Sequence, residues 1–132
     1  MKTCVVDCSF FMGFIMPDEK NSFIDLSEYK VFVPSIFFLE CMNVLKSAFS
    51  KKRITAEEYE ESIWAFKNLP LNVDHFSSTQ ESLQTIYNIC KDNDLTSYDA
   101  SYLELSMRLK SPLGTLDKQL IKICKNNKIQ IL

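Results

Sequence analysis

The chain has 132 residues, of which 46% are hydrophobic and 24% are charged, a composition typical of one folded domain rather than of a disordered segment. Its two glycines and four prolines exclude collagen-like and linker-rich chains. The formal net charge of −2 excludes a strong overall positive field, so any contact with nucleic acid must come from local basic clusters or bound cations. We expect a single domain over residues 1–132.

Short apolar or β-branched runs alternate along the chain with longer segments of helical periodicity. A short helix is expected to begin near Ser9, and a second helix to run from Ser35 to about Lys51. The runs predict five strands, at residues 3–6, 31–33, 71–73, 113–116 and 129–132.

Capping patterns mark the helices of the middle of the chain. Thr55 and Glu58 form a capping box, and the helix they begin must stop before Pro70. Ser78 and Glu81 form a second such pattern, which predicts a helix over residues 79–91.

Two further helices complete the chain. Thr96 is expected to cap a helix that runs through Lys110, because Ser111 and Pro112 follow. The last helix is expected over residues 118–127. Strands that alternate with helices need crossover connections, so the pattern predicts an α/β fold whose mainly parallel sheet has helices on both faces.

Four acidic residues are the candidate functional groups, and three of them also have simple structural explanations. Asp7 follows the first strand and Asp117 the fourth, so both belong at the carboxyl edge of the sheet, where α/β folds bind ligands. Each could also cap the helix that follows it, and Asp99 stands three residues after Thr96, a common position for an acid in a helix cap.

Glu40 resists a structural explanation. It lies in a helical stretch that is apolar almost all the way round, which predicts burial on most faces, and it shares a polar stripe with Asn43. An ionised carboxylate without a partner there would cost several kcal/mol, and the stretch has no basic residue before Lys46. If Glu40 meets the other three acids, Mg²⁺ or Mn²⁺ would relieve their repulsion, since oxygen ligands suit these hard ions.

The cysteines do not predict a second kind of metal site. Cys4, Cys8, Cys41, Cys90 and Cys124 form an odd set without a CxxC pair, which indicates free thiols in a reducing compartment. His75 is the only histidine, so the ligand spacing of a structural zinc site is absent.

The amino terminus resembles a secretory signal only superficially. Lys2 precedes an apolar stretch, but Asp7 interrupts it, and Pro17-Asp18-Glu19 stands where small cleavage-site residues would be expected. The apolar run from Phe10 to Met16 is far too short to span a membrane. We therefore expect a soluble, cytoplasmic protein.

Four segments together resemble the PIN-domain proteins, and among these the VapC-like toxins of bacterial toxin–antitoxin modules. In chain order the segments are Val5-Val6-Asp7-Cys8-Ser9, Val33-Pro34-Ser35 with Leu39-Glu40-Cys41-Met42-Asn43-Val44-Leu45, Leu95-Thr96-Ser97-Tyr98-Asp99-Ala100-Ser101-Tyr102-Leu103, and Pro112-Leu113-Gly114-Thr115-Leu116-Asp117. The likeness extends from Thr3 to Leu132.

The resemblance implies a three-layer α/β/α sandwich on a five-stranded, mainly parallel sheet. It also implies an endoribonuclease in which Asp7, Glu40, Asp99 and Asp117 bind Mg²⁺ or Mn²⁺ and hydrolyse RNA phosphodiester bonds, leaving 5′-phosphate and 3′-hydroxyl ends. Ser9, Asn43 and Thr115 match positions that support such a site. The expected partners are the RNA substrate, a cognate antitoxin protein and a second copy of the chain in a homodimer.

The sequence departs from the family pattern at two places. Cys8 replaces a small residue such as alanine, serine or threonine, and the connection from Pro17 to Tyr29 is short. That connection often contributes to antitoxin contact in the family, so its shortness affects the geometry expected for a partner.

Basic residues that could contact RNA form two clusters, for which a solvated surface is an equally good explanation. They are Lys51, Lys52 and Arg53 in one and Lys118, Lys122 and Lys125 in the other. The aromatic residues at positions 10, 11, 14, 37 and 38 are expected mostly in the core, beside a groove that could accept an amphipathic antitoxin segment.

Two other protein classes fit the sequence less well than a nuclease. A haloacid-dehalogenase-like phosphatase needs a second aspartate two residues after the first, where this chain has Ser9. A response-regulator receiver needs an acidic pair at the first strand and a phospho-acceptor at the third, but Asp7 stands alone and Asp74 lacks the matching lysine. The alternative that stays open is a PIN fold that binds RNA or a protein without cutting.

Overall fold

Four parallel strands form one sheet, in the order β3-β2-β1-β4. A computed structural model describes residues 1–16 and 24–132 of the chain. The strands are β1 (Lys2–Val6), β2 (Tyr29–Pro34), β3 (Leu71–Asp74) and β4 (Leu113–Gly114). Residues 17–23 lie outside the described residues. The segment Pro17-Asp18-Glu19 and much of the short connection from Pro17 to Tyr29 fall on them.

The prediction of a fifth strand was wrong. Residues 129–132 contribute one isolated parallel bridge, between Ile131 and Leu113. The Leu113 N–H donates to the Gln130 carbonyl at 2.9 Å, and the Leu132 N–H donates to the Leu113 carbonyl at 3.0 Å. β4 is only two residues long, so it offers a neighbour too short an edge for a longer ladder.

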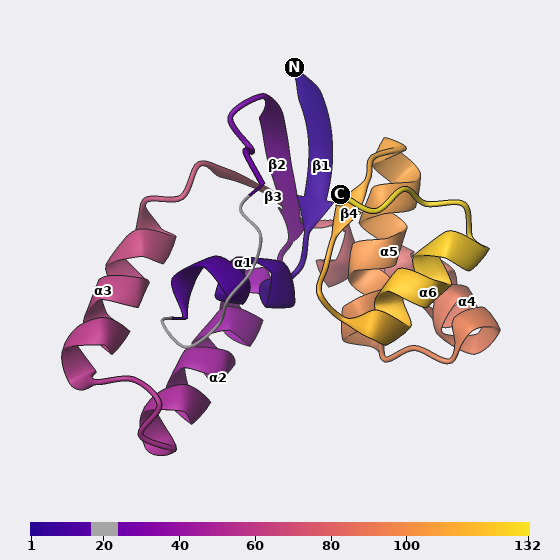
Figure 1. Ribbon diagram of the computed structural model, residues 1–132. Helices are drawn as coiled ribbons and strands as arrows, with labels where there is room; N and C mark the ends of the chain where they lie inside the picture. Colours follow the sequence, from indigo (N-terminus) through magenta and orange to yellow (C-terminus); the bar gives the residue numbers. More distant parts are fainter. Residues whose placement is uncertain (17–23) are drawn as a thin grey trace.

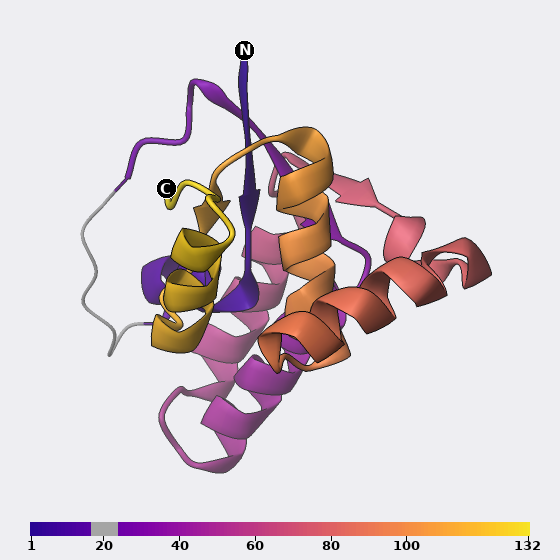
Figure 2. The same ribbon diagram turned by 90° about the vertical axis from the view of Figure 1, so that its right-hand side faces the viewer.

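Helices cover both faces of this sheet, as the predicted three-layer architecture requires. Figure 2 shows β1 edge-on, with α4 (Leu83–Asn93) and α5 (Ser97–Leu109) on one side and α1 (Cys8–Ile15) and α6 (Lys118–Asn126) on the other. α2 (Phe37–Ser50) lies beyond the arrowheads of β1 and β2, and α3 (Ala56–Lys67) packs beside it (Figure 1).

Of the three helix caps predicted at serine or threonine residues, two are present. Thr55 Oγ1 accepts the Glu58 N–H at 3.1 Å while Glu58 Oε1 accepts the Thr55 N–H at 2.9 Å, so the first capping box is confirmed. Thr96 Oγ1 accepts the Asp99 N–H at 3.2 Å at the start of α5. Each cap satisfies an amide that the helix itself leaves unpaired.

The prediction of a second capping box, at Ser78 and Glu81, was wrong. Two 3₁₀ turns, η1 (Phe76–Ser78) and η2 (Gln80–Ser82), occupy this stretch, and α4 begins only at Leu83. The Ser78 hydroxyl bonds to the hydroxyl of Ser35, and Thr79 Oγ1 donates to the Phe76 carbonyl at 2.6 Å. Neither hydroxyl accepts an amide at the start of α4, because Ser78 and Thr79 precede that start by several residues and lie in or beside the 3₁₀ turns.

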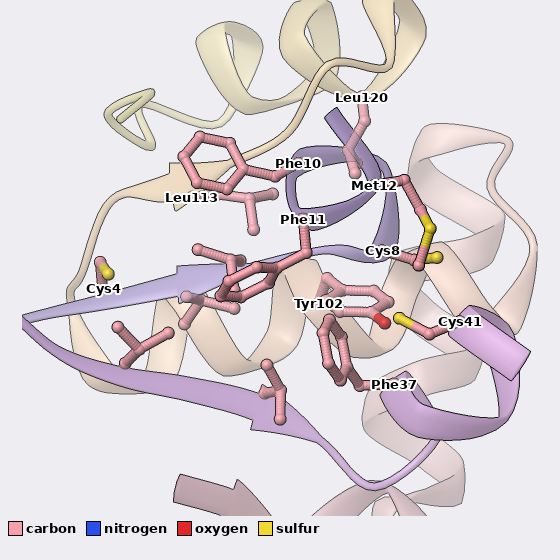
Figure 3. Packing of buried hydrophobic residues seen from close by; sticks show 14 of the residues in the cluster. Cys4, Cys8, Phe10, Phe11, Met12, Phe37, Cys41, Tyr102, Leu113 and Leu120 are labelled. Carbon is pink, nitrogen blue, oxygen red and sulfur yellow. The ribbon is translucent and has the colours of Figure 1, made fainter. Parts of the chain in front are cut away.

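The core lies between the sheet and the helices and is rich in aromatic rings, as the sequence predicted. Phe10, Phe11 and Phe37 are buried, and the Phe11 and Phe37 ring centroids lie 5.7 Å apart in an edge-to-face arrangement. Figure 3 shows these rings beside β1, with Tyr102 of α5 reaching toward Cys41 of α2.

The expectation that α2 is buried on most faces was wrong. Phe37, Cys41 and Leu45 are buried on one face, but Leu39 is 65% exposed and Met42 is also exposed. These two side chains border the cavity described below. An apolar helix pattern does not distinguish the wall of a cavity from a contact with the core.

The cysteines and the helix lengths match two simple expectations. All five cysteines are free, and four of them are buried. Within residues 1–16 and 24–132, no helix has the length and apolar character needed to cross a membrane.

Candidate functional site

A cavity of about 890 Å³ opens at the carboxyl edge of the sheet, and all four candidate acids line it. Asp7 precedes α1, Glu40 lies in the first turn of α2, Asp99 lies in the first turn of α5, and Asp117 precedes α6. The four acids are far apart in the sequence, and they come together because α1, α2, α5 and α6 all begin at this edge (Figure 1).

Asp7 and Asp117 also cap helices, as the structural explanation predicted. Asp7 Oδ1 accepts the Phe10 N–H at 2.9 Å, and Asp117 Oδ1 accepts the Leu120 N–H at 2.9 Å. Asp7 is buried, whereas Asp117 is exposed. The capping role fixes each carboxylate at the cavity, so it is compatible with a chemical role.

Two hydroxyl groups hold the carboxylate of Asp7 in place. Ser9 Oγ donates to Oδ1 at 2.7 Å, and Thr115 Oγ1 donates to Oδ2 at 2.5 Å. Ser9 Oγ in turn accepts the Leu116 N–H at 2.9 Å, and Thr115 Oγ1 accepts the Asp117 N–H at 3.1 Å. The hydroxyls therefore tie the end of β1 to the loop between β4 and α6.

Glu40 is held by a residue for which the sequence predicted no role. The buried Tyr102 donates its hydroxyl to Glu40 Oε1 at 2.7 Å. Tyr102 follows Asp99 by three residues, which puts both side chains on one face of α5. That spacing was the available signal, and it was missed because a tyrosine in a helix is most often part of the core.

The pKa values of Asp7, Glu40 and Asp99 are raised by burial and by the charges of neighbouring acids. Burial raises the pKa of Asp7, against three hydrogen bonds that lower it and the charge of Asp117 that raises it again. Burial also raises the pKa of Glu40, opposed by the Tyr102 hydrogen bond and assisted by the charges of Asp99 and Asp7. The pKa of Asp99 is raised by burial and by the charges of Asp117 and Asp7. The carboxylates are thus close enough to interact electrostatically.

The chemistry of this donor set fits a hard divalent cation. No lysine, arginine or histidine is among the described residues that line the cavity, so no side chain there offsets the four carboxylates. Oxygen ligands of this kind suit Mg²⁺ or Mn²⁺. In the described part of the chain, however, no three acidic, histidine or cysteine side chains stand close enough together to hold one ion. The charges fit an ion, but the present spacing does not form a complete coordination shell.

A comparison with protein families identifies this arrangement. The sequence model of the PIN domain matches residues 4–126, which is nearly the whole chain. The chain belongs to the PIN domain family. PIN domains are generally nucleases that act on RNA, and they typically use divalent metal ions.

A solved structure has the same fold as this PIN domain. The crystal structure of PAE2754 from Pyrobaculum aerophilum is similar over 92% of this chain and 85% of that chain, with a TM-score of 0.67 and 19% sequence identity. At that identity the likeness supports the fold alone. No curated protein matches the chain.

The other sequence-predicted residues lie in and around the cavity of the PIN domain to different degrees. Asn43 lines it, one turn of α2 after Glu40. None of the predicted RNA-contacting side chains lines it; Lys118 and Lys122 are exposed on α6, directly after Asp117. The first basic cluster, Lys51, Lys52 and Arg53, is exposed at the turn after α2.

Apolar side chains at the mouth of the cavity form the second feature that the sequence did not predict. Leu39, Met42, Tyr98 and Leu116 all line the cavity and are all exposed. Each lies one or two residues from one of the four acids. The cavity therefore combines four acidic side chains with a rim of exposed apolar side chains.

Proposed function

We propose that this PIN domain is an endoribonuclease that uses Mg²⁺ or Mn²⁺ to hydrolyse RNA phosphodiester bonds. The observation that supports it most directly is that Asp7, Glu40, Asp99 and Asp117 line one cavity whose lining, in the described residues, has no cationic side chain. Burial and the charges of neighbouring acids raise the pKa values of Asp7, Glu40 and Asp99, so these carboxylates are unfavourable neighbours until a positive charge joins them.

In this proposal Asp7 and Asp99 would chiefly hold the ion, with help from Glu40 and Asp117, and the ion would offset the negative charge of the scissile phosphate. A bound divalent ion supplies positive charge and makes water a better nucleophile near neutral pH. Ser9 and Thr115 fix both oxygens of Asp7, and Tyr102 fixes one oxygen of Glu40, so these two acids enter the reaction already oriented. A carboxylate that is not occupied by the ion takes the proton of the attacking water.

RNA contact is proposed for the basic residues nearest the acids. Lys118 directly follows Asp117, and Lys122 lies one turn further along α6, so both can meet phosphates that flank the cavity. Lys51, Lys52 and Arg53 follow the end of α2, about 16 Å along the helix from Glu40 at 1.5 Å per residue. The second group can only contact nucleotides several positions away from the cut.

We also propose that the nuclease is the VapC-like toxin of a toxin–antitoxin pair that acts in the cytoplasm and forms a homodimer. The apolar rim of Leu39, Met42 and Leu116 supports a protein partner, since an amphipathic segment placed there would cover the acids. Mass measurement of the purified protein, alone and with the product of a neighbouring gene, tests both associations.

The proposal is tested by incubating the purified protein, freed of any partner by unfolding and refolding, with mixed RNA and Mn²⁺. Asp7→Asn should abolish cleavage, because an asparagine keeps an oxygen for the Phe10 N–H cap but loses the negative charge. Asp92→Asn, an exposed acid on α4 outside the cavity, is the matched control and should cleave like the wild type. Equal cleavage by the wild type and Asp7→Asn refutes the assignment.

The alternative is a PIN fold that binds RNA or a protein without catalysis, and the wide spacing of the acids supports it. Titration with Mn²⁺ separates the two functions. The nuclease requires stoichiometric Mn²⁺ binding that Asp7→Asn weakens, whereas helix caps without a metal role bind no stoichiometric Mn²⁺. Retention of labelled RNA without cleavage at saturating Mn²⁺ would favour the alternative.

A further inference from the structure

A second cavity, of about 420 Å³, lies beside the acidic one and has different chemistry. Ile36, Leu39 and Tyr98 line both cavities, so the two share a wall. Its lining residues come from the segments around the starts of α2, α4 and α5, and α4 and α5 lie side by side (Figure 2). The remaining lining residues are Ser35, Ser77, Ser78, Ser82, Leu83, Ile86, Ser97 and Ser101.

The second cavity is uncharged, and its mainly apolar lining carries a set of serine hydroxyls. Six serines line it, and none of its described lining residues is acidic or basic. Ser101 Oγ donates to the Tyr98 carbonyl at 2.6 Å, and Ser82 Oγ donates to the Thr79 carbonyl at 2.8 Å. Both of these side chains are buried, so the serines most open to a ligand are the exposed Ser78 and Ser97, whose hydroxyls can donate or accept a hydrogen bond. The cavity therefore offers hydrogen-bonding groups without the positive charge that a phosphate needs.

Large exposed side chains stand around these hydroxyls. Leu39 is 65% exposed, Tyr98 is 57% exposed and Leu83 is 67% exposed. A ligand that fits both features has a flat face for stacking and a polar edge for hydrogen bonds. A nucleobase has both, and bases of unpaired RNA are recognised in this way, by stacking on aromatic rings and hydrogen bonds to their edges.

We infer that the second cavity is a nucleobase subsite, in which a base of the RNA strand stacks on Tyr98 and meets the serine hydroxyls with its edge. This inference rests on the proposed function, since the phosphate next to that base would lie in the acidic cavity on the other side of the shared wall. Tyr98 lines both cavities and immediately precedes Asp99 of the acidic one, so a base stacked on Tyr98 would lie beside the acidic cavity. The base must be unpaired, because in a duplex its faces are stacked on neighbouring bases and its Watson–Crick edge is occupied.

A protein segment fits this cavity less well than a base. An apolar anchor of a partner would make no use of the serine hydroxyls, whereas the polar edge of a base can hydrogen-bond to those that are exposed. The rim of the acidic cavity, around Met42 and Leu116, has no such set of hydroxyls and suits an apolar segment better.

Binding without cleavage tests the subsite. Fluorescence anisotropy in EDTA measures the Kd of the wild type and of Tyr98 variants for short labelled homopolymers of each of the four ribonucleotides. Tyr98→Ala should weaken binding of the preferred homopolymer about fivefold or more, the lower end of the loss for one stacked base. Tyr98→Phe keeps the ring and should stay within twofold. Tyr87→Ala, an equally exposed tyrosine on α4 outside both cavities, is the matched control and should also stay within twofold.

Three results of the binding comparison between variants would overturn the inference: wild-type affinity in Tyr98→Ala, an equal loss in Tyr87→Ala, or an equal loss for a fully paired duplex. If Tyr98→Ala keeps its RNA affinity but releases a protein partner, the surface belongs to that partner. RNA cleavage with Mn²⁺ that does not depend on Tyr98 refutes the subsite and leaves the nuclease intact. Binding that depends on Tyr98 without cleavage refutes the nuclease and leaves the subsite intact, and a wild type that does neither refutes both.

Discussion

Replacing Tyr102 by phenylalanine removes one hydroxyl from the wall of the acidic cavity and leaves the ring in place. Tyr102 is 1% exposed and its hydroxyl donates to Glu40 Oε1 at 2.7 Å. Because the ring volume is unchanged, no void of the kind made by truncating a core residue is expected. The variant therefore isolates the hydrogen bond to the carboxylate.

The expected cost follows from the charge and exposure of Glu40. Hydrogen bonds to charged groups contribute about 1.5–3 kcal/mol. Glu40 is only half-buried, so water can replace the lost donor, and the lower end, about 1.5 kcal/mol at pH 7, applies. For a chain of this length that corresponds to a Tm lower by about 5 °C.

The pH dependence of this cost has a definite sign. The Tyr102 hydrogen bond lowers the pKa of Glu40, so its stabilising effect is present while the carboxylate is ionised and shrinks as the pH falls through that pKa. A neutral carboxyl group retains only an ordinary hydrogen bond, of about 0.5–1.5 kcal/mol. The gap in unfolding free energy between wild type and variant should therefore be larger at pH 7 than at pH 4.

Urea denaturation in EDTA at both pH values, followed by circular dichroism, measures this gap. Tyr87→Phe, an exposed tyrosine on α4, is the control and should differ little from the wild type. If Tyr102→Phe is as stable as the wild type at pH 7, the hydrogen bond contributes nothing. A gap that grows on acidification would contradict the electrostatic reasoning.

Two further substitutions test the charges and the packing. Asp99→Asn should raise the stability of the metal-free protein at pH 7 by about 0.5 kcal/mol, a small effect because solvent screens a half-exposed group. Since the pKa of Asp99 is raised, the stability lost as the pH rises from 4 to 7 should be larger in the wild type than in this variant, and equal slopes in melts with EDTA would contradict this. Gly114→Ala should cost about 1–3 kcal/mol by overpacking, because a Cβ there would lie 3.0 Å from the buried Phe10 ring; an unchanged urea midpoint would show that the ring can move.

The fold was largely predictable because its elements have clear local signals. β1 and β2 coincide with apolar runs of the sequence. α3 and α5 begin directly after Thr55 and Thr96, whose hydroxyls cap them as predicted. The errors lie where distant residues decide the outcome. The Ser78 hydroxyl bonds to the hydroxyl of Ser35, 43 positions earlier in the chain. The strand predicted at residues 129–132 does not form, because its neighbour β4 is only two residues long.

The position of the acids was predictable for a topological reason. Asp7 directly follows β1 and Asp117 comes shortly after β4, and because these strands are parallel both side chains are expected at the carboxyl edge of the sheet. Tyr102 and Tyr98 were missed because nothing local distinguishes a tyrosine that faces a cavity from one that faces the core. The exposure of Leu39 was missed for the same reason, since helical periodicity reports a face and not what covers it.

The structural and chemical explanations of Asp7 and Asp117 turn out to depend on the same geometry. A helix cap needs a side-chain oxygen at the helix start, and the helix start here lies at the carboxyl edge of the sheet. Capping uses Oδ1 of each aspartate, and in Asp117 no hydrogen bond to Oδ2 is present among the described residues. A carboxylate can thus serve both purposes, whereas an asparagine can serve only the first. Capping preferences alone therefore cannot argue against a metal-binding role, and substitutions that keep the cap are the ones that separate folding from chemistry.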